Sequence, residues 1–149
     1  MRFPIRARRL ALLFAAVALG TSGCGEEKGE RIVSVTGTVT RKGKPVAGLL
    51  VTFVPQTGKN SYPSYGITNE NGEYYLTNRS TGERGATVGT QKVWVSIPPV
   101  PPDDDDKKKA ARAKTSGDLA EILKKYGKLE STTLTFEIKG DQVIDLPLD

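Results

Sequence analysis

Apolar and polar residues alternate most regularly at the start of the stretch from residue 33 to residue 55. Val33, Val35 and Val39 share one face of an extended chain, and serine and threonine side chains occupy the other face. A period of two residues is typical of a half-buried β-strand. The pattern therefore predicts a strand from Val33 to Thr40.

A break separates this strand from a second one. The segment Lys42–Pro45 ends the first strand, because Gly43 can adopt a positive φ and Pro45 has no N–H to donate to a ladder. Val51 and Phe53 then return to the apolar face. We expect the two strands to form the first hairpin of an antiparallel sandwich.

Five further segments alternate in the same way, which brings the expected number of strands to seven. They are residues 65–68, 74–77, 92–97, 133–139 and 144–146. Short strands separated by frequent turn residues are typical of a sandwich in which two sheets share one core. The alternation therefore predicts an all-β fold.

A turn is expected between the third and fourth strands. Asn71-Gly72 suits a type I′ hairpin turn, because both central residues of that turn have positive φ. The oxygens of Asn69, Glu70, Asn71 and Glu73 offer an alternative, a calcium loop. A calcium loop of the EF-hand kind needs acids at fixed alternate positions and a distal bidentate glutamate, which this stretch lacks. The residues favour a turn.

An insertion, residues 98–131, separates the fifth strand from the sixth. It opens with Pro98–Pro102, a stiff segment, because consecutive prolines favour polyproline II. Near its end, residues 117–127 predict one short helix with an acid in its first turn, lysines in its last and Gly127 to close it. Its apolar residues fall at i, i+3, i+4 and i+7, namely Leu119, Ile122, Leu123 and Tyr126. We expect this helix to dock on the sandwich rather than on a partner, since four apolar residues make a small interface.

Four consecutive aspartates, Asp103–Asp106, lie inside the insertion. Their carboxylates could recruit a divalent cation. Lys107–Lys109 follow directly and would compete for the same carboxylates. The pattern favours a solvated charged run, and the sequence leaves open whether the aspartates bind cations.

Residues 1–23 have the pattern of an export signal. An arginine-rich segment precedes ten apolar residues, Leu10–Leu19. As a helix these would be about 15 Å long, roughly half the thickness of the hydrocarbon core, so a signal peptide fits better than a spanning anchor. The small residues before Cys24 resemble the lipobox of bacterial lipoproteins, although Thr21 replaces the usual leucine. The resemblance implies cleavage before Cys24 and a lipid on its sulfur; the alternative is an ordinary signal peptide.

Residues 24–31 are polar and contain glycine, which predicts a tether between the lipid and a domain at residues 32–149. In lipoproteins generally, an aspartate directly after the lipidated cysteine favours retention in the inner membrane, and here that residue is Gly25. We therefore expect an exported protein that is lipid-anchored to a bacterial membrane. The resemblance favours the outer membrane or the cell surface over the inner membrane.

Composition excludes several classes of function. The formal charge is +5, but four arginines lie in the signal segment, which leaves 18 basic against 17 acidic residues, a net charge of +1. A nearly neutral domain lacks the basic surplus of a nucleic-acid binder. The chain has no histidine and one cysteine. Histidine-dependent nucleophiles, histidine-ligated metals, an intramolecular disulfide and thiolate clusters are therefore excluded, and we assign no catalytic, cofactor-binding or metal-binding residue.

Several segments together resemble a known family through their order and spacing. They are Gly37–Val39 with the turn Gly43–Gly48, then Val51–Pro55, Thr68–Leu76 and Gly89–Val95. They resemble the carboxypeptidase-regulatory-like or transthyretin-like β-sandwich and, more narrowly, short bacterial lipoproteins made of one such module. The resemblance implies a seven-stranded antiparallel sandwich, immunoglobulin-like or transthyretin-like, with one short helix in an insertion before the last two strands. Gln91 departs from the family's inward aromatic residue, and Asn69 from its aspartate.

That family is mostly non-catalytic, and its hydrolase relatives depend on histidines that this chain lacks. The leading hypothesis is a lipid-anchored envelope protein that acts as a structural or interaction module. Besides the membrane, its partner would be an envelope protein or polysaccharide. The alternative is an extracytoplasmic module that binds carbohydrate or peptide through exposed aromatic residues, Trp94, Tyr62 and Tyr75. Trp94 leads because its neighbours Val93 and Val95 are expected to face the core, although it could instead pack beneath the insertion.

Metabolic labelling with a fatty-acid analogue tests the predicted anchor. We expect label on the wild-type chain and none on the Cys24→Ala variant, because Cys24 is the only cysteine in the sequence. Label on both chains, or on neither, would contradict lipidation at Cys24.

Overall fold

The computed structural model describes residues 31–58, 62–100 and 117–149. The predicted signal segment, Cys24, all but the last residue of the tether and the aspartate run 103–106 lie outside the described residues. Strands dominate the described ranges, which also contain one α-helix. The predicted all-β class is therefore confirmed.

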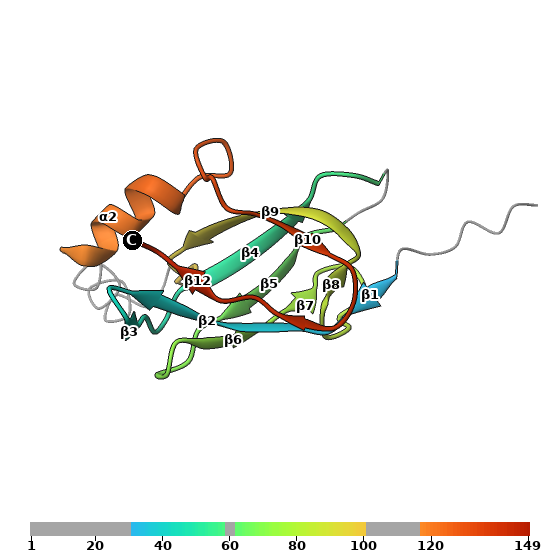
Figure 1. Ribbon diagram of the computed structural model, residues 1–149, viewed down its shortest axis with the longest axis horizontal. Coiled ribbons are helices and arrows are strands. Elements are labelled where there is room, and N and C mark those ends of the chain that lie inside the picture. The colour runs from blue at the N-terminus through green and yellow to red at the C-terminus, as the bar shows by residue number, and fades with distance from the viewer. Residues whose placement is uncertain (1–30, 59–61, 101–116) are drawn as a thin grey trace, which may run out of the picture.

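The described ranges contain twelve strands and the helix α2 (Figure 1). The strands are β1 (Ile32–Val33), β2 (Val35–Arg41), β3 (Lys44–Pro45), β4 (Leu50–Pro55), β5 (Ser64–Ile67), β6 (Glu73–Tyr75), β7 (Thr77–Asn78), β8 (Ala86–Thr87), β9 (Gly89–Ser96), β10 (Thr135–Ile138), β11 (Gln142–Val143) and β12 (Leu146–Pro147). The helix α2 is Asp118–Tyr126, as its apolar spacing predicts. The expected last strand at 144–146 is divided, because β11 ends before Ile144 and β12 begins at Leu146.

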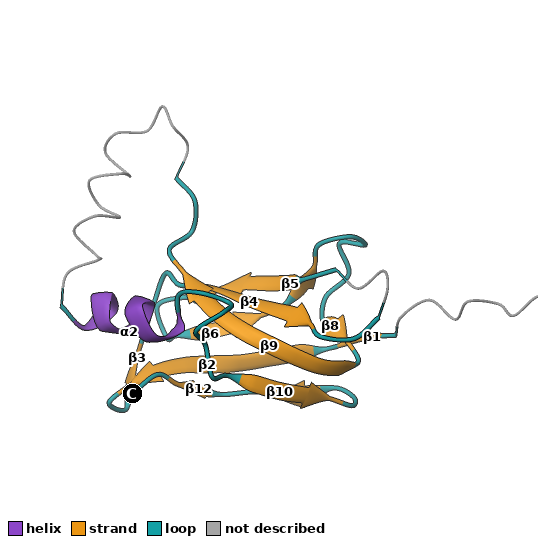
Figure 2. Ribbon diagram, turned by 90° about the horizontal axis from the view of Figure 1, so that it is seen from above, coloured by secondary structure: helices purple, strands orange, loops and turns teal. Residues whose placement is uncertain are grey.

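Two sheets form the body of the domain (Figures 1 and 2). The first has the order β10-β9-β4-β5-β7, and all its neighbours are antiparallel. The second is built on β2, which pairs with β3 and β6 along one edge and with β11 and β12 along the other. A small third sheet joins β1 to β8. Apolar side chains of the two large sheets meet between them.

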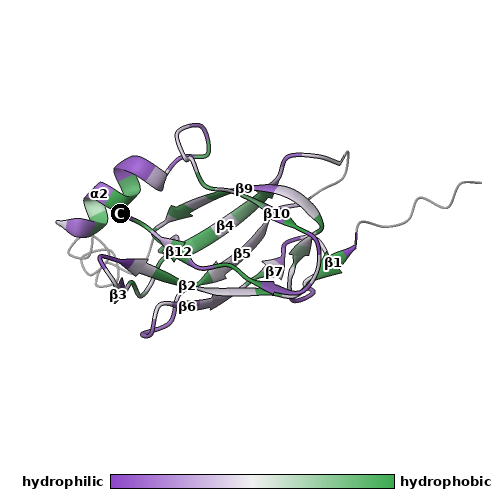
Figure 3. Ribbon diagram, viewed as in Figure 1, coloured by the Kyte–Doolittle hydropathy of each residue, from purple (hydrophilic) through white to green (hydrophobic). Residues whose placement is uncertain are grey.

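Phe53 lies at the centre of this core. It is fully buried on β4, and its ring centroid lies 6.3 Å from that of Tyr74 on β6, in the opposite sheet. Val33, Val35 and Val39 are buried, which confirms the valine face expected from the alternation. Figure 3 shows apolar residues concentrated along β4. Burying such side chains supplies most of the free energy that holds the two layers together.

The predicted first hairpin is wrong in its pairing. β2 turns back on β3, not on β4, through Lys42 and Gly43, whose φ values of 48° and 74° are both positive as in a type I′ turn. This hairpin is only two pairs long. The chain then crosses to the other sheet, and Leu49 is fully buried in the crossing. Because both sheets contribute to the same core, the apolar pattern of β4 cannot tell which sheet it joins.

The predicted hairpin between the third and fourth strands is wrong for the same reason, since β5 pairs with β4 and β7, and β6 with β2. The turn between them is not type I′: the N–H of Gly72 donates to the carbonyl of Asn69 at 2.9 Å, and of these residues only Gly72 has positive φ. The Asn69 Oδ1 accepts the backbone N–H groups of Asn71 and Glu73, both at 2.9 Å. These bonds make Asn69 a turn residue.

A bent strand links the two sheets at this edge. β6 pairs with β2 in one sheet and β7 with β5 in the other, so the chain changes sheets at the fully buried Leu76. Gly66 on β5 lies so near this bend that a Cβ would come within 2.2 Å of the Tyr75 carbonyl oxygen. Gly66 therefore takes the inward position, and Tyr65 and Ile67 face outward.

The C-terminal segment runs parallel to β2, which corrects the expectation of an antiparallel sandwich throughout. Three aspartates spaced four residues apart accept backbone N–H groups of β2 and its flanks. The bonds are Ser34 N to Asp141 Oδ1 at 2.8 Å, Thr38 N to Asp145 Oδ1 at 2.9 Å and Lys42 N to Asp149 Oδ1 at 2.7 Å. Each carboxylate thus accepts an N–H group of β2 or of a flanking residue, alongside the backbone bonds of the divided strand.

Gly37 sits where the segment divides into β11 and β12. A Cβ there would come within 1.8 Å of the Ile144 carbonyl oxygen, so only glycine fits. That carbonyl accepts the Tyr74 hydroxyl at 2.7 Å. Burial, with the charge of Asp145 adding to it, raises the pKa of Tyr74 well above its ordinary value. The phenol therefore stays neutral and keeps donating this bond.

Substitution of Asp145 tests the carboxylate contacts to β2. In Asp145→Ala the Thr38 N–H loses its acceptor, and we expect the free energy of unfolding to fall by about 1 to 2 kcal/mol in urea denaturation. Asp145→Asn retains an acceptor oxygen and should lose less.

Glu137→Ala is the matched control, because Glu137 belongs to an exposed ion pair with Lys139, which contributes little to stability. If Asp145→Ala were no less stable than Glu137→Ala, the side-chain bonds to β2 would not hold the C-terminal segment.

Candidate functional site

A groove of about 800 Å³ lies on the outer face of the first sheet. Leu50, Thr52 and Val54 of β4 form its floor. Tyr65 of β5 borders the floor on one side, and Trp94 of β9 on the other. This hollow combines two aromatic rings with apolar and charged side chains.

The strand register aligns the two rings. Thr52 pairs with Tyr65 on one side and with Trp94 on the other, so the three side chains form a row across β5, β4 and β9. Two interstrand spacings place the rings about 10 Å apart at their backbones. A small threonine between two large rings leaves room for a ligand above it.

The floor explains why β4 is apolar on both faces. Val51 and Phe53 are fully buried in the core. Leu50 and Val54 point the other way and are half-buried in the groove. Strands that are apolar on both faces are typical of sheets covered on both sides. In the described chain, residues 128–130 cover one end of this face.

The sequence left open whether Trp94 is part of a contact surface or packs beneath the insertion, and the structure shows features of both. Trp94 faces outward, opposite to Val93 and Val95, it is half-buried, and the groove that it lines is also lined by the segment Lys128–Glu130, which follows α2. The side chain thus shares an open groove with residues of the insertion.

The other two predicted aromatic residues lie apart from this row. Tyr62 is 51% exposed and precedes Pro63, which lines the groove. Tyr75 is 53% exposed, but it borders a different hollow of about 430 Å³ and lies under the Arg84 guanidinium, 4.6 Å from its ring centroid. The structure thus separates Tyr75 from Trp94.

Sequence analysis missed Tyr65 as a site residue. Its alternation with Gly66 predicts a strand but gives no face, because an aromatic residue normally takes the buried position. The sequence signal that could have identified Tyr65 was the neighbouring Gly66, because a glycine within a strand often marks a place where another backbone approaches closely. The inward Gly66 turns Tyr65 toward the groove.

Basic side chains outnumber acidic ones around the groove. Arg79, which follows β7, and Lys128, which follows α2, line it, and Glu130 is the one acid among the lining residues. Lys92 lies on the same outer face, opposite Val54. Within the described ranges, Arg79, Lys92 and Lys128 form no ion pair. Among the described residues, positive charge at the groove therefore exceeds negative charge.

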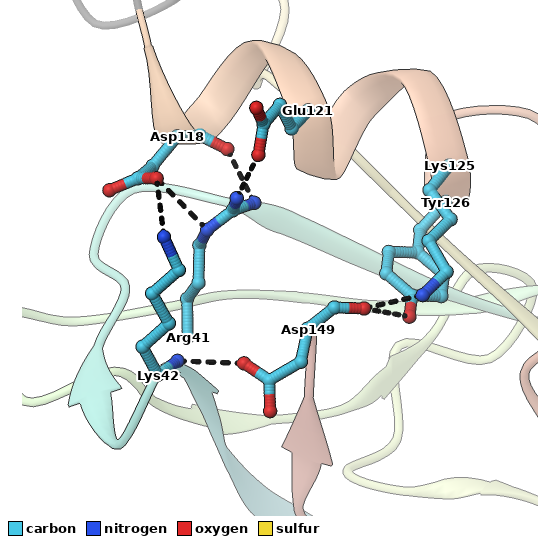
Figure 4. A network of polar contacts seen from close by, with 7 residues as sticks. All are labelled: Arg41, Lys42, Asp118, Glu121, Lys125, Tyr126 and Asp149. Carbon is cyan, nitrogen blue, oxygen red and sulfur yellow. Dashed lines mark hydrogen bonds and ion pairs between the residues drawn. The ribbon is translucent and has the colours of Figure 1, made fainter.

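A polar network holds the helix that positions this wall (Figure 4). The side chain of Arg41, only 10% exposed, lies at the end of β2 and donates to the Asp118 carbonyl at 2.7 Å. It also pairs with the carboxylates of Asp118 and Glu121. At the other end of the helix, Tyr126 and Lys125 donate to the Asp149 carbonyl. Ile122 and Tyr126 are buried beneath α2, which confirms that the helix docks on the sheets.

A further hollow of about 490 Å³ lies between α2 and the β2–β3 turn. Its buried cation, Arg41, is already engaged by the helix, so it does not call for a ligand. No three histidine, cysteine, aspartate or glutamate residues of the described ranges converge to hold a metal ion. No helix in those ranges is long and apolar enough to span a membrane.

Gln91 was singled out as a departure from the family's inward aromatic residue. It is 1% exposed, and its Nε2 donates to the Thr87 carbonyl at 2.7 Å. Its Oε1 is buried without a hydrogen-bond partner. Gln91 thus satisfies its amide in part and lies away from the groove.

No family model, curated protein or solved structure matches this chain.

Replacing Arg41 tests whether α2 supports the groove. In Arg41→Gln the helix loses its charged contacts, and we expect the free energy of unfolding to fall by about 1 to 2 kcal/mol. The amides of α2 should exchange faster, and Trp94 emission should shift to the red as the wall loosens. Trp94 is the sole tryptophan, so the emission reports on this place alone.

Lys139→Gln is the control, because it removes the same charge from an exposed pair. Unchanged emission and unchanged exchange in Arg41→Gln would show that the network does not hold the wall of the groove.

Proposed function

We propose that this chain is an exported, lipid-anchored cell-envelope protein whose all-β domain is a non-catalytic interaction module. The groove between Tyr65 and Trp94 carries the proposal, because it offers aromatic surface, an apolar floor and unpaired charge in one place. The export-signal pattern and Cys24 support its location at the cell envelope.

The placement of the elements supports an anchored interaction module. The tether of residues 24–31 spans at most roughly 28 Å when fully extended. It leads into β1, which lies at the opposite end of the domain from α2 (Figure 1). A lipid on Cys24 would thus hold the β1 end near the membrane and leave the α2 end directed away from it.

The chemistry of the groove supports binding rather than catalysis. General acid–base catalysis needs two titratable groups whose pKa values are pushed apart in one site. Glu130 is the one carboxyl group that lines the groove in the described chain. The sequence contains no histidine to act as a second group near neutral pH.

We also propose that the fold is a variant of the seven-stranded immunoglobulin-like or transthyretin-like sandwich seen in carboxypeptidase-regulatory-like modules. Two facing sheets, with the helix before the last strands, support this assignment. The variant would differ in its C-terminal strand, which is divided at Ile144.

Titration of the full chain with fractions of the bacterial envelope tests the interaction module. We expect at least one fraction to shift or quench the emission of Trp94 in a saturable way, because a ligand in the groove would cover its ring. Tyr65→Ala should weaken the response, whereas Tyr75→Ala, which removes a similarly exposed ring on another face, should not. An absence of response to every fraction would refute binding through this groove.

A further inference from the structure

The ligand class follows from the side chains that line the groove. Arg79 directly follows β7, the strand beyond β5, and Lys128 belongs to the segment after α2. Across the paired strands the order is ring, threonine, ring, and the groove that holds this row is also lined by these two cations. A ligand that lies across the strands therefore meets stacking surface and positive charge in the same groove.

The backbone of the floor is not available to a ligand. β4 pairs with β5 along one edge and with β9 along the other over most of its length. A peptide could not add to it as a further strand, which is the usual source of affinity for an extended peptide on a sheet. Recognition in this groove must come from side chains.

A sugar chain matches these side chains better than a peptide does. The flat C–H faces of pyranose rings stack on aromatic rings, and Thr52 offers a hydroxyl group between them. The ring positions are about 10 Å apart by two interstrand spacings, which is about the span of two sugar units in an extended polysaccharide. The aromatic pair could therefore hold two neighbouring sugars.

The charge of the groove indicates whether the sugar ligand is acidic or neutral. Arg79 and Lys128 line the groove, and Lys92 lies on the same outer face; none has an ion-pair partner in the described chain, and Glu130 is the single lining carboxylate. Arginine and lysine bind carboxylates through charge-assisted hydrogen bonds. We propose that the groove binds an acidic polysaccharide with carboxylate groups on its sugars. This inference rests on the proposed function and names its partner.

Titration of the full chain with oligogalacturonate, followed by Trp94 emission, tests the inference. We expect a saturable change that weakens as sodium chloride is raised, because the charges are exposed. The double variant Arg79→Gln/Lys128→Gln should bind about tenfold or more weakly. Tyr65→Ala should also bind more weakly, since one stacking ring is lost.

Matched controls separate specific from general effects. Lys44→Gln/Lys139→Gln removes two positive charges outside this groove, and Tyr75→Ala removes an exposed ring elsewhere. Both should bind oligogalacturonate like the wild type. Thermal unfolding of every variant verifies that it is folded, and calorimetric titration confirms affinities without relying on fluorescence.

Other ligands decide between the alternatives. Equal affinity for a neutral cello-oligosaccharide would overturn the acidic assignment, and equal affinity for polyglutamate would overturn the sugar. A response to envelope fractions but not to oligogalacturonate would refute this inference alone. No response to either would refute the proposed function as well.

Discussion

The pairing of β2 with the C-terminal segment is the constraint on which the rest of the domain depends. β2 is the one strand that every other member of its sheet contacts. At a four-residue interval, Asp141, Asp145 and Asp149 accept the N–H group of Thr38 within β2 and those of Ser34 and Lys42 on its flanks. The C-terminal segment divides into two short parallel strands opposite Gly37, so its backbone alone does not accept every N–H group along β2 and its flanks. The side-chain carboxylates accept N–H groups that would otherwise lack a partner.

This constraint reaches the groove through the helix. The last residue of β2, Arg41, engages the start of α2, and Asp149 accepts bonds from its end. The segment Lys128–Glu130, which follows the helix, lines the same groove as Trp94. A long-range sheet contact therefore helps to position a wall of the candidate site. The groove is lined by side chains from five regions of the chain, and only packing brings them together.

Surface chemistry explains how such a domain can recognise a partner without catalysis. Alternate residues of each strand form the core, so core packing does not restrict the residue types on the outer faces. On β4 two of the outer residues, Leu50 and Val54, are apolar, and the neighbouring strands add an aromatic ring on each side of Thr52. The charged residues that line the groove, Arg79, Lys128 and Glu130, are exposed, so a ligand can reach them. These features support binding by stacking and charge, the mode that we propose for an acidic polysaccharide.

The all-β class, the longer strands, the buried valine face and the docked helix could be predicted from the sequence, because each depends on a local period of two or 3.6 residues. The two-residue strands β3, β8 and β11 could not, since they are too short to show a period. The sequence also indicated Trp94, since a strand with inward neighbours must turn that ring outward. The pairing of the strands could be learned only from the folded domain. The alternation in β4 and β6 would be the same in either sheet, so it does not indicate which sheet each strand joins. The outward position of Tyr65 also depends on tertiary structure. Its neighbour Gly66 lies against the backbone of Tyr75, and the sequence does not show that these two segments are neighbours. Local pattern specifies elements and faces, whereas pairing and the groove arise from contacts between residues far apart in the chain.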